Sequence, residues 1–157
     1  MSLGESKNEL VEKYGLYGAS AVIVIQRIEN DRIRELDLAT ITELWNNTFR
    51  ELSSRNSMPK NGCVFQCFAG LVFRGHVKFS DQITIKEELP FSKNYEYVKA
   101  AISILESDYN NKWPSDRNEH KLWSQVFVKL KRREIAYNLQ LHVLKALVEN
   151  EMIEGLQ

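Results

Sequence analysis

Five polar or nucleophilic residues are the best candidates for a small ligand site in this sequence. They lie near the starts of two expected helices and are Ser57, Lys60, Cys63, Asn138 and Gln140. A helix N-terminus presents unpaired N–H groups and partial positive charge, so the two helix starts, if they lie together, suit an anionic or carbonyl-bearing ligand. The alternative is structural: Ser57 caps a helix, Lys60 is solvated, and Asn138 and Gln140 bond to backbone.

The two cysteines define a second candidate chemistry. Cys63 and Cys67 are one helical turn apart, but a closed zinc site needs four ligands, and the three histidines are scattered. We therefore expect no metal, and we interpret both cysteines as structural thiols. Nucleophilic catalysis at Cys63 would need a lowered thiol pKa and a nearby base. A helix N-terminus and His142 are the candidates for these roles, which keeps a Cys-dependent enzyme as an alternative.

One basic cluster stands between the fifth and sixth expected helices, and it contains Lys129, Lys131, Arg132 and Arg133. Cations are favourable at a helix C-terminus, so a solvated turn explains the cluster. The functional alternative is phosphate contact by a helix-turn-helix-like protein that reads nucleic acid with its last helix. Zero net charge and flanking glutamates such as Glu134 argue against that alternative.

Composition and length indicate one soluble domain. The chain has 157 residues, of which 43% are hydrophobic and 27% charged, values typical of a globular protein. The longest apolar run, residues 19–25, is far shorter than the roughly 20 residues of a membrane span. With two cysteines and no recognisable signal peptide, the chain is expected to be cytoplasmic with reduced thiols. No cofactor motif is present.

Hydrophobic periodicity predicts six helices, at about residues 8–29, 40–52, 61–73, 92–106, 116–130 and 135–150. The segment 61–73 is apolar on almost every side, and Gln66 is its one plainly polar interior residue. A helix of this kind must be covered all round. We therefore expect it at the centre of the fold.

Three helix starts have recognisable capping residues. Thr40 and Glu43 have the spacing of a capping box, Asp116 and Glu119 suggest a similar arrangement, and Ser92 is expected to cap the fourth helix.

Glycines and one weakly alternating stretch mark the remaining local features. Gly15 and Gly18 interrupt the first helix and predict close backbone packing there. Gly75 is placed to end the central helix in a left-handed conformation. Residues 78–90 are the least helical stretch, for which a short extended piece or a hairpin is expected.

The two halves of the chain resemble each other. Tyr-x-x-x-Ala occurs at 17–21 and 97–101, Leu-Trp-x-x-x-Phe at 44–49 and 122–127, and a small residue followed by Leu-Val at 70–72 and 146–148. These matches predict tandem three-helix units at residues 9–79 and 92–153, with a flexible segment at 1–7. Each unit is too small to bury its apolar face alone, so the two should pack together.

The order and spacing of several residues resemble a group of small bacterial helical proteins classed as a domain of unknown function. The pattern runs over nearly the whole chain, from Tyr14 to Ile153, and includes Lys60-x-Gly62-Cys63, Gly70-Leu71, Leu122-Trp123 and Asn138-x-Gln140. The resemblance implies the helical fold and a bacterial origin, and it implies no activity. This chain departs from the pattern with Val64 in place of a proline and His142 in place of an acid.

We therefore expect one all-α, compact six-helix domain over residues 1–157, built as two three-helix units around a buried central helix. Its function is expected to be that of a non-enzymatic intracellular binding or interaction module. The partner is a small ligand or another protein rather than a membrane. Nucleic-acid binding and Cys63-dependent catalysis are the two alternatives.

Overall fold

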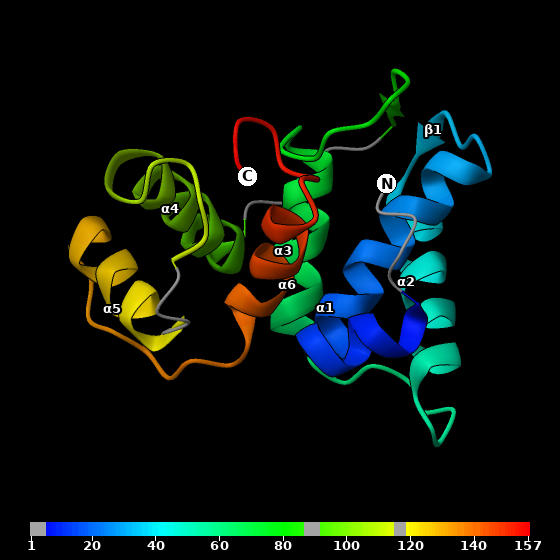
Figure 1. The fold of residues 1–157 in the computed structure, drawn as a ribbon, viewed down its shortest axis with the longest axis horizontal. Helices are drawn as coiled ribbons and strands as arrows, with labels where there is room; N and C mark the ends of the chain where they lie inside the picture. The colour runs from blue at the N-terminus through cyan, green and yellow to red at the C-terminus, as the bar shows by residue number, and fades with distance from the viewer. Residues whose placement is uncertain (1–5, 87–91, 115–118) are drawn as a thin grey trace.

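The computed structural model of the chain describes residues 6–86, 92–114 and 119–157. Within these ranges it forms six helices: α1 (Lys7–Asn30), α2 (Leu38–Leu52), α3 (Gly62–Phe73), α4 (Lys93–Asp108), α5 (Glu119–Leu130) and α6 (Gln140–Glu149). The predicted all-α class is confirmed. Figure 1 shows α3 and α6 in the middle, with α1 and α2 on one side and α4 and α5 on the other. Over the described ranges, no helix has both the length and the apolarity to cross a membrane.

The first helix begins and ends within one residue of its predicted bounds. Ser6 is its N-cap, and the Ser6 hydroxyl accepts a hydrogen bond from the N–H of Glu9 at 3.2 Å. Residues 6 and 7, expected to be flexible, therefore belong to the helix start. Residues 1–5 lie outside the described residues.

The structure gives a physical reason for the presence of each glycine in α1. Gly15 kinks the helix with φ 72°, a conformation that glycine adopts without strain. At Gly18 a Cβ atom would lie 2.7 Å from Cβ of Tyr14 and 3.2 Å from Cβ of Ala146 in α6. The predicted close packing is confirmed at Gly18.

The start of α2 differs from the prediction. Asp37 is the N-cap, because its Oδ1 accepts a hydrogen bond from the N–H of Thr40 at 2.8 Å. Thr40 therefore lies in the first turn of the helix, and the predicted Thr40–Glu43 capping box is wrong. Aspartate three residues before a free N–H is itself among the strongest caps.

The predicted central helix is α3. Eight of its twelve residues are buried, including the continuous run 67–73. It starts at the N-cap Asn61, whose Oδ1 accepts from the N–H of Val64 at 3.3 Å. After its end, Gly75 has the predicted left-handed conformation, with φ 80°.

Coverage of α3 is incomplete at its first two turns. Gly62 and Gln66 are exposed there, and Phe65 is only partly buried. The expectation that this helix is covered on every side is therefore wrong at its start. The uncovered surface faces the beginning of α4.

The least helical stretch contains strand β2 (Thr84–Ile85), which pairs in parallel with β1 (Glu35–Leu36). The N–H of Thr84 donates to the carbonyl of Arg34 at 2.7 Å, and the N–H of Lys86 donates to the carbonyl of Leu36 at 2.8 Å. An extended piece is confirmed, but a hairpin is wrong for this pairing, because the partner strand lies just before α2. Residues 87–90 of the predicted stretch lie outside the described residues.

The starts of α4 and α5 were predicted from their caps. Ser92 does occupy the N-cap position of α4, but its side chain makes no capping bond. Its hydroxyl instead donates to Oε1 of Gln66 at 3.2 Å. The predicted cap at Asp116 falls outside the described residues.

The last helix starts at Gln140, five residues later than predicted. Leu139 has a left-handed backbone, with φ 65°, so a helix cannot run through it. In the segment before it, the carbonyl of Ile135 accepts the indole N–H of Trp123 at 2.9 Å, which holds the segment on α5. The helix that follows buries seven of its ten residues.

Two clusters of aromatic rings fill the two sides of the fold. The rings in contact are Tyr17 with Trp45 and Phe49 in one cluster, and Tyr97 with Trp123 and Phe127 in the other. Between the clusters, α6 packs mainly on α1, and α3 packs mainly on α4 and α6. The third helix of each predicted unit therefore packs on the first helix of the other unit.

Candidate functional site

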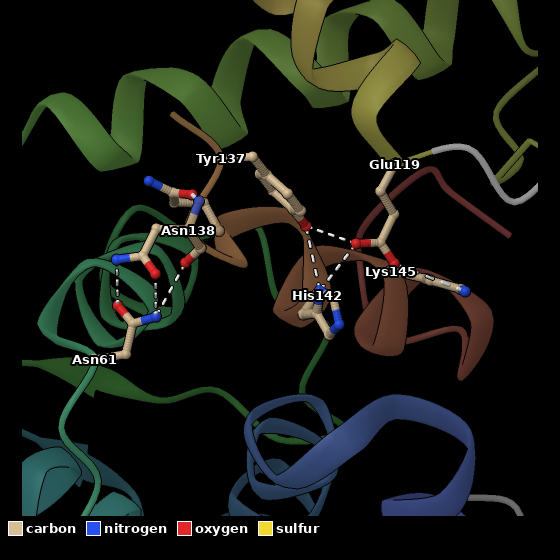
Figure 2. Close-up of polar contacts among 7 residues, drawn as sticks. Asn61, Glu119, Tyr137, Asn138, His142 and Lys145 are labelled. Carbon is tan, nitrogen blue, oxygen red and sulfur yellow. Dashed lines mark hydrogen bonds and ion pairs between the residues drawn. The ribbon is translucent and has the colours of Figure 1, made fainter. Parts of the chain in front are cut away.

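The start of α3 and the segment before α6 meet at a pair of asparagines. Nδ2 of Asn61 donates to the backbone carbonyl of Asn138 at 3.0 Å and to its Oδ1 at 3.1 Å. Figure 2 shows these two side chains facing each other. The two helix starts that the sequence singled out therefore do lie together.

Three of the five predicted ligand residues share one hollow at this junction. Cys63, Asn138 and Gln140 line a shallow depression of about 580 Å³, together with residues at the start of α4, which we call the seam hollow. Ser57 and Lys60 are not among its lining residues. Ser57 lies in the preceding loop, where its N–H donates to Oγ of Ser53 at 3.3 Å.

A chain of hydrogen-bonded amides runs from the seam hollow past the start of α4 to Gln66 of α3. The N–H of Asn138 donates to Oε1 of Gln140 at 2.7 Å, and Nε2 of Gln140 lies 3.4 Å from Oδ1 of Asn94. Nδ2 of Asn94 in turn donates to Oε1 of Gln66 at 2.7 Å. We call this chain the amide relay. Gln140 is 2% exposed, so the relay satisfies a polar group that would otherwise be costly to bury.

The relay ends at a deeper cavity between the first turns of α3 and α4, which we call the α3/α4 cleft. It has a volume of about 460 Å³. It is lined by Leu38, Gly62, Phe65, Gln66, Ala69, Gly70, Arg74, Ser92, Lys93, Asn94 and Tyr95. Lys93 and Asn94 also line the seam hollow, so the two depressions adjoin each other at the start of α4.

Small residues on one face of α3 create the α3/α4 cleft. Gly62, Ala69 and Gly70 fall on the face that carries Gln66, at the spacing of neighbouring helical turns. At Gly70 a Cβ atom would lie 2.7 Å from Cδ1 of Tyr95, so the glycine lets that ring approach. This small-residue face was the available sequence signal, and the interpretation of α3 as a fully covered helix missed it.

A second polar group was also missed by sequence reasoning. We call it the charged cluster, and its members are Glu119, Tyr137, His142 and Lys145. Oε2 of Glu119 lies 2.6 Å from the Tyr137 hydroxyl and 2.9 Å from Nδ1 of His142, while Lys145 approaches its other oxygen at 3.8 Å. Figure 2 shows these side chains converging from α5, α6 and the segment between them.

The electrostatics of the charged cluster favour an ionised carboxylate. Burial alone would raise the pKa of Glu119, but hydrogen bonds from His142 and Tyr137 outweigh it, and the pKa lies below its usual value. Burial, followed by the hydrogen bond to Glu119, raises the pKa of Tyr137 far above its usual value. The cluster therefore ties three segments together through one fixed negative charge.

The two cysteines lie in different surroundings. Cys67 is fully buried, and burial, with a smaller contribution from Cys63, raises its thiol pKa well above the usual value. Cys63 lines the seam hollow, and Nδ1 of His142 is held by Glu119 and Tyr137. Catalysis by Cys63 with His142 as its base stays a prediction. Among the described residues, no group of three or more His, Cys, Asp or Glu is placed to hold a metal ion.

The basic turn after α5 is partly neutralised. Arg132 forms a two-pronged ion pair with Glu96 of α4, at 2.6 Å and 3.3 Å. Lys129, Lys131 and Arg133 are exposed. The helix that would read a nucleic acid in the alternative interpretation is α6, which is largely buried against α1 and α3. The nucleic-acid interpretation stays a prediction.

Fold and site together define a small all-helical protein with a cleft between two of its helices. The chain belongs to a family of unknown function, DUF6979, whose profile matches residues 13–154. The resemblance to an uncharacterised helical family is thereby confirmed. No curated protein and no solved structure matches the chain.

Proposed function

We propose that this protein is a non-enzymatic binding module that holds a small molecule in the α3/α4 cleft. The observation that carries this proposal is the cleft itself. Its volume of about 460 Å³ lies within the range of roughly 300–1,000 Å³ that is typical of small-molecule sites. Its described lining combines apolar residues such as Phe65, Leu38 and Ala69 with a few polar side chains. That combination orients a ligand and also buries it.

The described lining supports binding rather than catalysis. Carboxylates, cysteines and histidines are the usual catalytic acids, bases and nucleophiles. The described lining contains none of these side chains. Its two hydroxyl groups already have partners: Ser92 donates to Gln66, and the Tyr95 hydroxyl lies 2.8 Å from Nε2 of His76. Of the predicted ligand residues, Asn138 and Gln140 connect the seam hollow to the cleft through the amide relay.

We further propose that the chain is an internal duplication of one three-helix unit. One contact between matching positions of the halves supports this proposal: Val77 forms an antiparallel bridge with Ile153. Two strands that pair across a twofold axis perpendicular to them run antiparallel, as this bridge does. The two aromatic clusters also match position by position.

The duplication explains why only one such cleft is proposed. The residues that match Gln66 and Gly70 of the cleft are His142 and Ala146. At that second position His142 binds Glu119, and Gly15 of α1 stands where α4 has Tyr95. We infer that one copy of the site kept an open cleft, while the other became the charged cluster.

We also place the protein in the bacterial cytoplasm. Two thiols that form no disulfide with each other support a reducing compartment, and the family resemblance supports the bacterial origin.

A cleft-filling variant tests the binding proposal. A Cβ atom at Gly62 would meet no atom within 4 Å, so Gly62→Leu should fill the cleft without a clash and without loss of stability. Fragment binding followed by ¹H–¹⁵N spectra of the whole chain should perturb amides of Gln66, Ala69 and Tyr95. Gly62→Leu should abolish these perturbations.

Ser107→Leu is the matched control, since it adds the same side chain at an exposed position near the far end of α4. This variant should bind fragments as the wild type does. Fragments that bind Gly62→Leu as tightly as the wild type, or that perturb only amides remote from the cleft, would contradict the proposed site.

A further inference from the structure

The amide relay has a fixed direction because it starts at a backbone N–H. The orientation of an isolated amide side chain is ambiguous, since its O and N atoms look alike. The N–H of Asn138 can only donate, however, so the atom of Gln140 at 2.7 Å must be its carbonyl oxygen. Gln140 is therefore left with its NH₂ group to donate onward, to Oδ1 of Asn94 at 3.4 Å.

The same reasoning orients the last amide of the relay. With its oxygen accepting from Gln140, Asn94 must donate through Nδ2, and it does so to Oε1 of Gln66 at 2.7 Å. The Ser92 hydroxyl donates to the same oxygen at 3.2 Å. Two donors on Oε1 hold the Gln66 amide with its NH₂ group turned outward. No acceptor for this NH₂ group is found among the described contacts.

The described rim of the α3/α4 cleft therefore presents donors and positive charge. Besides Gln66, the described lining contains two cationic residues, Lys93 and Arg74. The guanidinium lies over the Tyr95 ring, 5.5 Å from its centre. None of the described lining side chains is acidic. A ligand that pairs with Gln66 and Lys93 must supply acceptors and negative charge.

We propose that the ligand of the α3/α4 cleft is a small monocarboxylate with a flat apolar body, whose carboxylate is bound by Gln66 Nε2 and Lys93. This inference rests on the proposed function, because it names the ligand class of the same cleft. The apolar body lies on Phe65 and Ala69. The relay makes Gln66 a donor, so it selects a carboxylate over the isosteric primary amide, which brings NH₂ donors of its own.

Two probes of equal shape test the inference: 2-naphthoate and 2-naphthamide, titrated calorimetrically against the whole chain at neutral pH. The wild type should bind the carboxylate about tenfold or more tightly than the amide, as expected for a charge-assisted hydrogen bond. Gln66→Glu replaces the NH₂ donor with a negatively charged acceptor. It should therefore weaken binding of the carboxylate about tenfold or more, and binding of the amide should be unchanged or tighter. Gln82→Glu introduces the same charge elsewhere, on the exposed loop before β2, and should change the affinity of neither probe.

The outcomes separate this inference from the proposed function. If Gly62→Leu blocks both probes but the wild type binds them equally, the carboxylate inference is overturned and the binding cleft stands. If Gln66→Glu has no more effect than Gln82→Glu, the role given to the amide relay is overturned. If neither probe binds the wild type, the carboxylate inference is overturned, and the fragment experiment decides the proposed function. If the probes bind and Gly62→Leu leaves their binding unchanged, the inference and the proposed function both fall.

Discussion

The side chain of Asn61 holds two parts of the fold at once. Its Oδ1 caps α3 by accepting from the N–H of Val64 at 3.3 Å, while its Nδ2 donates to both oxygens of Asn138, at 3.0 and 3.1 Å. The start of the central helix is thereby fixed to the segment that leads into α6. Removing the side chain breaks both connections, whereas a carboxylate at this position preserves the cap and removes the donor.

We expect Asn61→Ala to lower the free energy of unfolding by about 1–3 kcal/mol, from the lost cap and the lost bonds to Asn138. Asn61→Asp should cost less, because its carboxylate still caps α3. Asn47→Ala, at an exposed position inside α2, should have an effect within about 0.5 kcal/mol. Urea unfolding measures all three. An Asn61→Ala variant as stable as Asn47→Ala would show that the junction contributes nothing.

Two glycines should respond in opposite ways to the same substitution. We expect Gly18→Ala to destabilise the protein by about 1–3 kcal/mol, because its Cβ would lie 2.7 Å from Cβ of Tyr14 and 3.4 Å from the carbonyl of His142. Gly62→Ala should be neutral or stabilising by up to about 1 kcal/mol, since its Cβ meets nothing and alanine favours the helix. Thermal unfolding of both variants tests the pair, and equal effects would contradict the tight α1–α6 contact.

The helices could be predicted from the sequence because their signals are local. Neighbouring residues alone are enough to recognise the apolar stripe of α1, the apolar run in α3 and the left-handed Gly75. Two helix starts failed for a local reason as well. Asp37 stands three residues ahead of Thr40 and captures its N–H, and Leu139 adopts a left-handed conformation that is unusual for its residue type.

The charged cluster could not be predicted, because its residues come from separate segments. Glu119 stands at the start of α5, Tyr137 in the segment before α6, and His142 inside α6. No spacing rule brings them together; only the tertiary fold does, in which α4 packs on both α5 and α6. The α3/α4 cleft is an intermediate case. Its small residues lie on one face of one helix, but whether that face is covered depends on where α4 begins.

Acid should remove the contribution of Glu119 to stability. Its pKa is lowered in the folded protein, so the contribution is fully present above the pKa of the unfolded chain and is lost as pH falls through the folded value. We expect Glu119→Gln to lower the free energy of unfolding by roughly 1–3 kcal/mol at pH 7, with a difference from wild type that shrinks between about pH 5 and pH 3.

Glu106→Gln, which removes an exposed carboxylate from α4, is the matched control and should show no such pH-dependent difference. Urea unfolding at several pH values gives the comparison. If the difference in free energy of unfolding between Glu119→Gln and the wild type stays constant down to pH 3, the charged cluster does not stabilise the ionised form of Glu119.

The two thiols should differ sharply in reactivity, although they are one helical turn apart. Cys67 is fully buried, its pKa is raised by burial, and its Sγ lies 3.5 Å from the carbonyl of Asn94, whereas Cys63 is partly exposed in the seam hollow. Iodoacetamide should therefore modify one site in the native protein and two after unfolding, as counted by mass spectrometry. Alkylation of Cys67 requires opening of the fold, so it should be slower than that of Cys63 by about a thousandfold or more.

Cys63→Ser is the control, and it should leave the native protein unmodified on the same timescale. The rate at Cys63 also bears on the enzyme alternative, because a catalytic thiol reacts faster than a free one. If the protein is a binding module, iodoacetamide should alkylate Cys63 no faster than it alkylates glutathione at the same pH. Alkylation of Cys63 that is tenfold or more faster than that of glutathione would instead favour a Cys-dependent enzyme, provided that His142→Ala removes the acceleration and His120→Ala does not. His142 is the informative histidine, because it lies on α6, which borders the seam hollow, whereas His120 does not.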